Sequence, residues 1–135
     1  IVGEDKDLSD ASLSDSIYYT LFPNFHPWGG YNRIVYRFRP YDNRYDKSIM
    51  ECYYISPFSG DRPDPAPVHW LAEDEDWTEA PELGILAKVF QQDSFNLPNV
   101  QIGLAAAQYE EIVLANYQET KIRHFHDLLS TWIGE

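Results

Sequence analysis

Cysteine is nearly absent from this sequence of 135 residues, in which Cys52 is the single example. One cysteine cannot form an internal disulfide, and a cysteine-based metal cluster cannot be built within the chain. This usage is typical of a reducing compartment. Methionine is equally scarce: Met50 is the only one, and the sequence begins with Ile1. We therefore expect Ile1 to be a processed or cut end and the chain to be a fragment.

Positive charge is also scarce, with 10 Lys and Arg against 22 Asp and Glu, a formal net charge of −12. Such a chain repels phosphate backbones and anionic lipid head groups, which argues against nucleic-acid and membrane partners. The sequence has no run of about 18 apolar residues and no basic, apolar signal segment at its start. We expect a cytoplasmic protein.

Aromatic residues, in contrast, are abundant: ten Tyr, seven Phe and four Trp make up 16% of the chain. This content suits a domain whose interior binds flat apolar ligands, and a large aromatic core explains it equally well. The length is that of one domain, which is enough to bury a core.

The N-terminal half predicts an antiparallel meander after a flexible acidic arm at residues 1–15. Residues rich in β-branched and aromatic side chains predict three strands, over 16–22, 31–39 and 48–56, separated by a loop at 24–30 and a turn at 40–46. In the second strand, Ile34, Tyr36 and Phe38 alternate with Arg33, Val35, Arg37 and Arg39, which indicates a sheet covered on one face.

The C-terminal half predicts helices after a long proline-rich connection at residues 57–81, which contains a candidate short strand at 69–71. Apolar residues from Leu83 recur at helical spacing, and Pro98 indicates a kink or a new helix start. Residues 110–115 allow a short extended segment. The terminal helix is predicted from one apolar face, formed by Ile122, Phe125, Leu128, Leu129, Trp132 and Ile133. The predicted fold class is α+β.

Asp93 occupies an unusual place in this helical pattern. It falls within a row that is otherwise apolar, formed by residues 83, 86, 90, 97, 100 and 104. A buried, unpaired carboxylate costs several kcal/mol, so we expect Asp93 to be neutralised, hydrogen-bonded or bound to a cation. Asn96 lies three residues further and could bond a metal ligand or a water. The alternative is that Asp93 or Asn96 caps the helix that restarts at Leu97.

The histidines do not form a metal site by spacing. His124 and His126 lie roughly 200° apart around a helix, so we expect them to face solvent or to support other groups. His26 is expected to pack in a loop or to line a pocket, and His69 to be structural. We expect the acidic run at residues 73–76 to be a solvated face. Phosphate-binding loops, a nucleophile elbow and a zinc-protease motif are missing.

Three separated blocks resemble the catalytic domain of Rieske ring-hydroxylating oxygenase α subunits: LFPNFHPWG at 21–29, RIVYRFRP at 33–40 and VFQQDSFNLP at 89–98. They occur in the family's order, and the likeness runs from about residue 14 to the end. The resemblance implies a partial helix-grip domain (START/Bet v 1-like), with an antiparallel sheet and a long C-terminal helix. It also implies that Asp93 is the carboxylate ligand of a mononuclear ferrous ion and that Asn96 is a supporting polar residue.

The family's two Cys/His pairs for the [2Fe–2S] Rieske cluster and its two iron-binding histidines do not occur here. We therefore expect them upstream, in the missing part of the protein, and we expect the fragment alone to be inactive and to self-associate or bind another chain. The family forms trimers. A non-catalytic helix-grip module that binds a hydrophobic ligand is the alternative.

The activity implied by the resemblance is insertion of one or two oxygen atoms into an aromatic or other apolar substrate, as in aromatic catabolism. The electrons come from NAD(P)H through a separate reductase, sometimes a ferredoxin, and the Rieske cluster. Candidate substrate-facing residues are Tyr36, Phe38, Leu86, Phe90 and Leu97.

Overall fold

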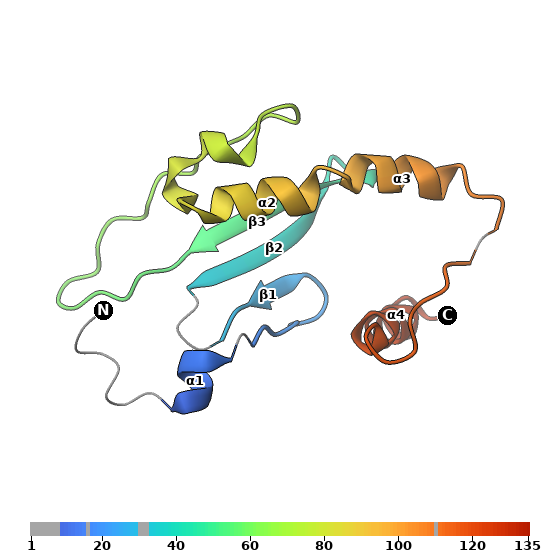
Figure 1. The fold of residues 1–135 in the computed structure, drawn as a ribbon, viewed down its shortest axis with the longest axis horizontal. Helices are drawn as coiled ribbons and strands as arrows, with labels where there is room; N and C mark the ends of the chain where they lie inside the picture. Colours follow the sequence, from blue (N-terminus) through green and yellow to red (C-terminus); the bar gives the residue numbers. More distant parts are fainter. Residues whose placement is uncertain (1–8, 16, 30–32, 110) are drawn as a thin grey trace. The chain divides into compact units, whose positions relative to one another are not determined.

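The alternating residues after position 33 form the main hairpin, made of β2 (Ile34–Tyr41) and the antiparallel β3 (Arg44–Tyr54) (Figure 1). The computed structural model describes residues 9–15, 17–29, 33–109 and 111–135, without the side chains of residues 12 and 13. Asp42 and Asn43 make the turn at φ 50° and 54°, a left-handed conformation that Asp and Asn tolerate. The hairpin was predicted, but two residues suffice to reverse the chain, so the strands extend into the expected turn at 40–46.

The first strand lies later than predicted. β1 (Phe25–Pro27) pairs antiparallel with β2, giving the strand order β1-β2-β3, whereas residues 17–21 make only isolated bridges to the segment around β1. The amide N–H of Tyr19 donates to the carbonyl of Pro27 at 2.9 Å, but Pro27 has no N–H to return. The missing donor interrupts the ladder, so the predicted strand is wrong for residues 17–22, and the predicted loop contains β1. Residues 16 and 30 of these predictions lie outside the described ones.

The predicted alternation of side chains along β2 is present, but burial is not confined to one face, since Val35 is as buried as Ile34. Tyr36 lies opposite Cys52 and Phe38 opposite Met50, while Arg37 lies opposite Glu51 on the other face. This follows from the two-residue period of a strand. The most buried residues of the sheet are Ile34 and Val35 at its start, each 6% exposed.

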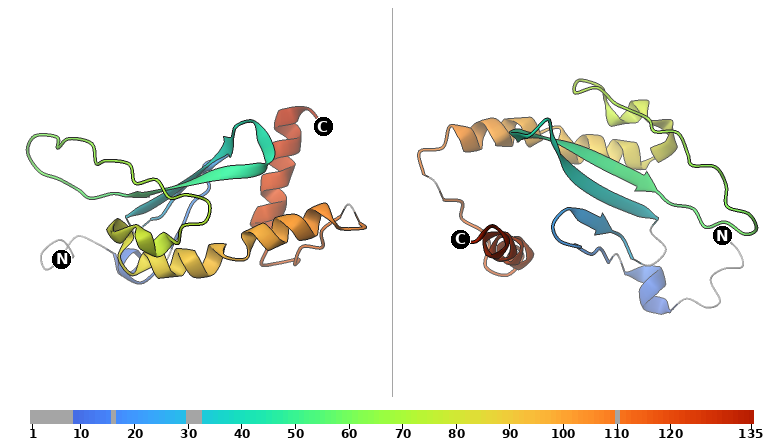
Figure 2. Two further views of the ribbon diagram at one scale, coloured as in Figure 1. Left: turned by 90° about the horizontal axis from the view of Figure 1, so that it is seen from above. Right: turned by 180° about the vertical axis from the view of Figure 1, so that it is seen from behind.

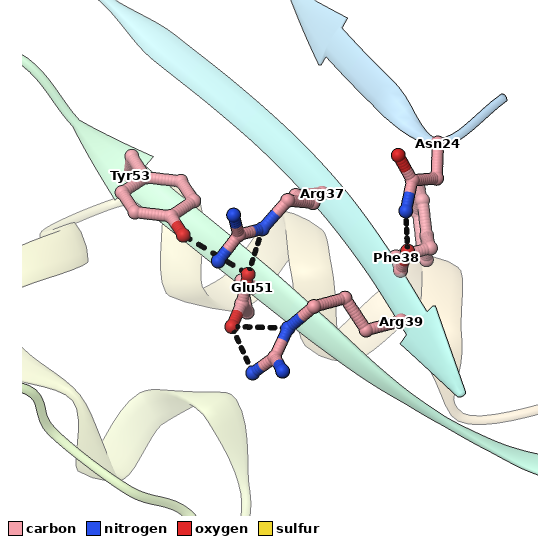
Figure 3. Close-up of polar contacts among 6 residues, drawn as sticks. All are labelled: Asn24, Arg37, Phe38, Arg39, Glu51 and Tyr53. Carbon is pink, nitrogen blue, oxygen red and sulfur yellow. Dashed lines mark hydrogen bonds and ion pairs between the residues drawn. The ribbon is translucent and has the colours of Figure 1, made fainter. Parts of the chain in front are cut away.

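Glu51 organises the charged face of the hairpin (Figure 3). Its carboxylate accepts hydrogen bonds from the guanidinium groups of Arg37 and Arg39 and, at 2.9 Å, from the hydroxyl of Tyr53. The guanidinium of Arg37 also lies over the Tyr53 ring, 5.6 Å from its centroid. The Glu51 side chain is 19% exposed, and its two Arg partners lower its pKa from 4.5 to about 2. The ionised form is therefore stabilised in the folded state.

Helix α4 (Thr120–Ile133) is the predicted terminal helix. Its Phe125 and Trp132 rings contact Phe22, with centroids 5.4 and 5.2 Å apart. The Arg123 guanidinium donates to the carbonyl of Ala115 at 2.7 Å, which ties the preceding segment to the first turns of the helix. The helix ends at Gly134, whose positive φ of 83° suits a residue without a side chain.

The N-terminal residues include a short helix, α1 (Asp10–Ser14), within the stretch predicted to be a flexible arm. The hydroxyl of Ser14 donates to the carbonyl of Asp10 at its end. The rest of that prediction, at residues 1–8, lies outside the described residues. The segment at 111–115 contains neither a strand nor a helix, and residue 110 of the predicted extended segment lies outside the described residues.

The chain divides into two units, residues 1–55 with 109–135, and residues 56–108. The second unit begins with the predicted long connection, in which residues 69–71 do not form the candidate strand. Its ordered part contains two short 3₁₀ helices and the two predicted α-helices, which follow each other along the chain (Figure 2). These elements are η2 (Trp77–Glu79), η3 (Pro81–Leu83), α2 (Leu86–Ser94) and α3 (Leu97–Ala105).

The helical interruption predicted near Pro98 is confirmed, since α3 begins one residue before this proline, where the missing N–H costs no helical bond. The sheet and the helices together confirm the α+β class. Among the described residues, the helices are all too short or too polar to cross a bilayer.

Replacing Glu51 with Gln should lower the free energy of unfolding by about 1–2 kcal/mol near neutral pH, because the two Arg partners lose an ionised acceptor. Glu51 has a folded pKa of about 2 against an ordinary value of 4.5. Its contribution is therefore fully present above pH 4.5 and is lost as the pH falls toward 2. Urea unfolding at a series of pH values measures the difference between the two proteins.

Glu111→Gln is the matched control, because Glu111 is an exposed glutamate outside this cluster. A Glu51→Gln deficit that stays constant from neutral pH into the acid range would contradict the assignment.

Candidate functional site

Helix α2, which carries the candidate metal ligand, is held by contacts with η2. The Trp77 ring packs on Phe90, with centroids 5.2 Å apart, and the Trp77 amide N–H donates to Oε1 of Gln91 at 2.9 Å. Ala87 and Phe90 are 3% and 6% exposed and form the packed side of the helix. This side is therefore fixed by one ring contact and one hydrogen bond to a main-chain donor.

Asp93 is exposed, which corrects the expectation that it points inward with the apolar row. The packed side of α2 is centred on Ala87, Phe90 and Gln91, and Asp93 lies roughly 200° from Gln91 around the helix. Within the described part of the chain, the Asp93 carboxylate forms neither a hydrogen bond nor an ion pair. It is therefore available to a ligand from outside these residues.

The capping alternative holds in position only. Asn96 is the residue before the first turn of α3, but its side chain makes no capping bond to a backbone N–H; its Oδ1 accepts from Nδ2 of Asn99 at 3.2 Å. Asp93 lies inside α2 and does not cap α3. The three-residue spacing between Asp93 and Asn96 therefore spans the break between two helices.

The four histidines are dispersed. His124 and His126 are both exposed on α4, as expected. His69 is not without a partner, since its Nδ1 lies 3.1 Å from both carboxylate oxygens of Glu82, thirteen residues away. Local sequence could not reveal that pair. In the part of the chain that the structure describes, there is no group of three or more His, Cys, Asp and Glu side chains that could hold a metal ion.

An aromatic surface lies on one face of the sheet. The ring of His26 packs edge-on against Phe38 with centroids 5.4 Å apart, and Trp28 packs edge-on against Tyr36 at 6.3 Å. Partial burial lowers the pKa of His26, whose Nδ1 lies 3.3 Å from the Thr20 hydroxyl. The neutral imidazole is therefore favoured, and this face presents flat, uncharged rings.

The proposed substrate-facing residues fall into the two units. Tyr36 is half-buried and Phe38 is 38% exposed on β2; Leu86 is half-buried, Phe90 is buried and Leu97 is 58% exposed in the second unit. Phe90 is covered by Trp77, so its described role is packing.

Gln91, Trp77 and Glu51 were missed as organising residues in the sequence analysis. Gln91 directly follows Phe90, which belongs to the apolar row. This position is the sequence feature that could have indicated that the Gln91 side chain is packed. Its donor is a backbone N–H, which every non-proline residue has, so sequence could not single it out.

The comparisons with known proteins identify the family. The model of the family "Ring hydroxylating alpha subunit (catalytic domain)" matches residues 3–135. The chain therefore belongs to this family, whose members are oxygenases that are generally iron-dependent. The sheet with its terminal helix is consistent with a helix-grip-like fold. No curated protein and no solved structure matched the chain.

Cys52, near the end of β3, should be a slowly reacting thiol. Burial raises its pKa from 9.0 to about 11, which reduces the thiolate fraction near neutral pH. We expect iodoacetamide to alkylate the folded chain at least about 10-fold more slowly than the denatured chain at pH ~8. Mass spectrometry of timed samples measures both rates, and Cys52 is the single site of reaction. Equal rates would show that the thiol is not protected.

Proposed function

We propose that the chain contributes Asp93 as the carboxylate ligand of a mononuclear ferrous ion in a ring-hydroxylating oxygenase. The observation that carries the proposal is the family match over residues 3–135 together with the position of Asp93, which α2 presents outward without a bond to the described residues. A carboxylate that is neither paired nor buried can accept a cation without first losing another partner.

The donor chemistry of Asp93 fits this metal in part. Ferrous iron in such sites takes two imidazoles and one carboxylate, and leaves positions open. The described residues contain no group of three or more His, Cys, Asp and Glu side chains that could hold a metal ion. The chain would therefore supply one ligand, and the imidazoles would come from outside it. Asn96, the residue before α3, is the proposed supporting residue that would bond a metal ligand or a water.

When bound, the ferrous ion would supply the site where dioxygen is activated for insertion into an aromatic or other apolar substrate. The chain's own residues would hold the metal and exclude water. The proposed apolar contacts for the substrate are Tyr36 and Phe38 in the first unit and Leu86 and Leu97 in the second, each unit taken by itself, and Phe90 supports α2 from within.

The partners follow from the proposed chemistry. Electrons would come from NAD(P)H through a reductase, and in some systems a ferredoxin, to a [2Fe–2S] Rieske cluster outside this chain. A homo-oligomer, a trimer by analogy with the family, is the proposed assembly.

Asp93→Ala in the complete α subunit should weaken ferrous-ion binding by at least about 100-fold and abolish hydroxylation, because the metal loses its charged ligand. The fold should remain, since Asp93 is exposed and makes no contact that holds α2. Metal analysis after dialysis measures iron, product formation measures turnover, and far-UV circular dichroism checks the fold.

Asp74→Asn is the matched control, because Asp74 is an exposed acid in the same unit and should bind iron like the parent. If Asp93→Ala retained iron and turnover, the metal-ligand role would be wrong. If Asp93→Ala lost neither iron nor turnover and still bound an apolar ligand, a non-catalytic binding module would be favoured.

A further inference from the structure

The contact between Gln91 and Trp77 has a geometric consequence for Asp93. Residues two apart on a helix point roughly 200° away from each other. Gln91 faces η2, because its Oε1 accepts the Trp77 amide N–H at 2.9 Å. With Gln91 held against η2, Asp93 lies roughly 200° from Gln91 and roughly 60° from Phe90 around α2, and its side chain is exposed.

Helix α2 contacts both η2 and η3 within the second unit. The buried residues of the second unit are Ala80, Ala87 and Phe90. Two of these side chains are single methyl groups, which allow a helix to turn or slide more easily than interlocking side chains do. The Phe90 ring contact and the Gln91 hydrogen bond are the contacts with η2 that depend on the rotation of α2 about its axis. Of the two, the hydrogen bond has the stricter angular requirement.

The donor to Gln91 is the backbone N–H of Trp77, which a change of side-chain rotamer cannot move. The Trp77 N–H belongs to the first residue of η2 and is part-buried in its bond to Gln91. An amide left without an acceptor in such a place costs about 1–3 kcal/mol. A rotation of α2 that moved Gln91 away from η2 would incur this cost.

We propose that Gln91 is a positioning residue for the metal ligand, because its hydrogen bond to Trp77 sets the rotation of α2 and so presents Asp93 outward. This inference rests on the proposed function of Asp93. Gln91 itself does not touch the metal.

Three variants of the complete α subunit test the proposal. Gln91→Leu removes the acceptor at similar size, Gln91→Glu keeps an oxygen acceptor at the same reach, and Gln92→Leu makes the same change at an exposed neighbour. Anaerobic titration of the metal-free protein with Fe²⁺ alone gives the binding constant, and urea unfolding gives the stability of each protein.

We expect Gln91→Leu to weaken Fe²⁺ binding by about 10–100-fold, the range found when groups that orient metal ligands are lost. Gln91→Glu should restore binding to within about threefold of the parent. Gln92→Leu should bind as the parent does. Should Gln91→Leu fail to fold, Gln91→Asn is the second variant, because it withdraws the acceptor by one methylene and should weaken binding in the same direction.

The outcomes separate this inference from the proposed function. If folded Gln91→Leu is less stable than the parent but binds Fe²⁺ equally well, Gln91 is merely structural and the inference is wrong. A Gln91→Glu protein that binds as weakly as Gln91→Leu would also overturn it. If Asp93→Ala binds Fe²⁺ like the parent, the proposed function itself fails, whatever the Gln91 variants do.

Discussion

The hydrogen bond from the Trp77 amide to Gln91 links the short 3₁₀ segment to the helix that carries the candidate ligand. Around it, the second unit has a small core in which an indole ring covers Phe90 and two alanines permit close approach. The orientation of α2 relative to η2 therefore depends on the ring contact and on the hydrogen bond. The proposed role of Asp93 makes the orientation of this helix the most consequential property of the unit.

The predictable parts of the fold were those with a strong local pattern. Alternation in β2 and the apolar face of α4 located both elements, and Pro98 correctly indicated where one helix ends and the next begins. The start of the sheet was misplaced because Pro27 lacks the N–H that would complete the ladder. Strand propensity depends on the side chains, whereas the start of the sheet at β1 depends on a missing backbone donor.

The orientation of Asp93 could not be predicted for a related reason. Its place in the apolar row suggested burial, since it lies close to Phe90 around the helix. The packed side is nevertheless shifted toward Gln91, because a main-chain donor on η2 meets that side chain. The helical pattern singled out Asp93, the resemblance implied its role as a ferrous-ion ligand, and its exposure came only from the structure.

The pairing register at the turn end of the hairpin determines which side chains of β2 and β3 share a face of the sheet. Asp42 and Asn43 reverse the chain and bring Tyr41 opposite Arg44, and a register shift between Pro40 and Tyr41 then sets Arg37 opposite Glu51 and Tyr36 opposite Cys52. One inserted residue that slipped the pairing by a single position would exchange the faces of β3. The guanidinium groups would then meet sulfur and hydrocarbon, and the carboxylate would lie among the rings. Natural variation in this loop should therefore occur in steps that preserve strand parity.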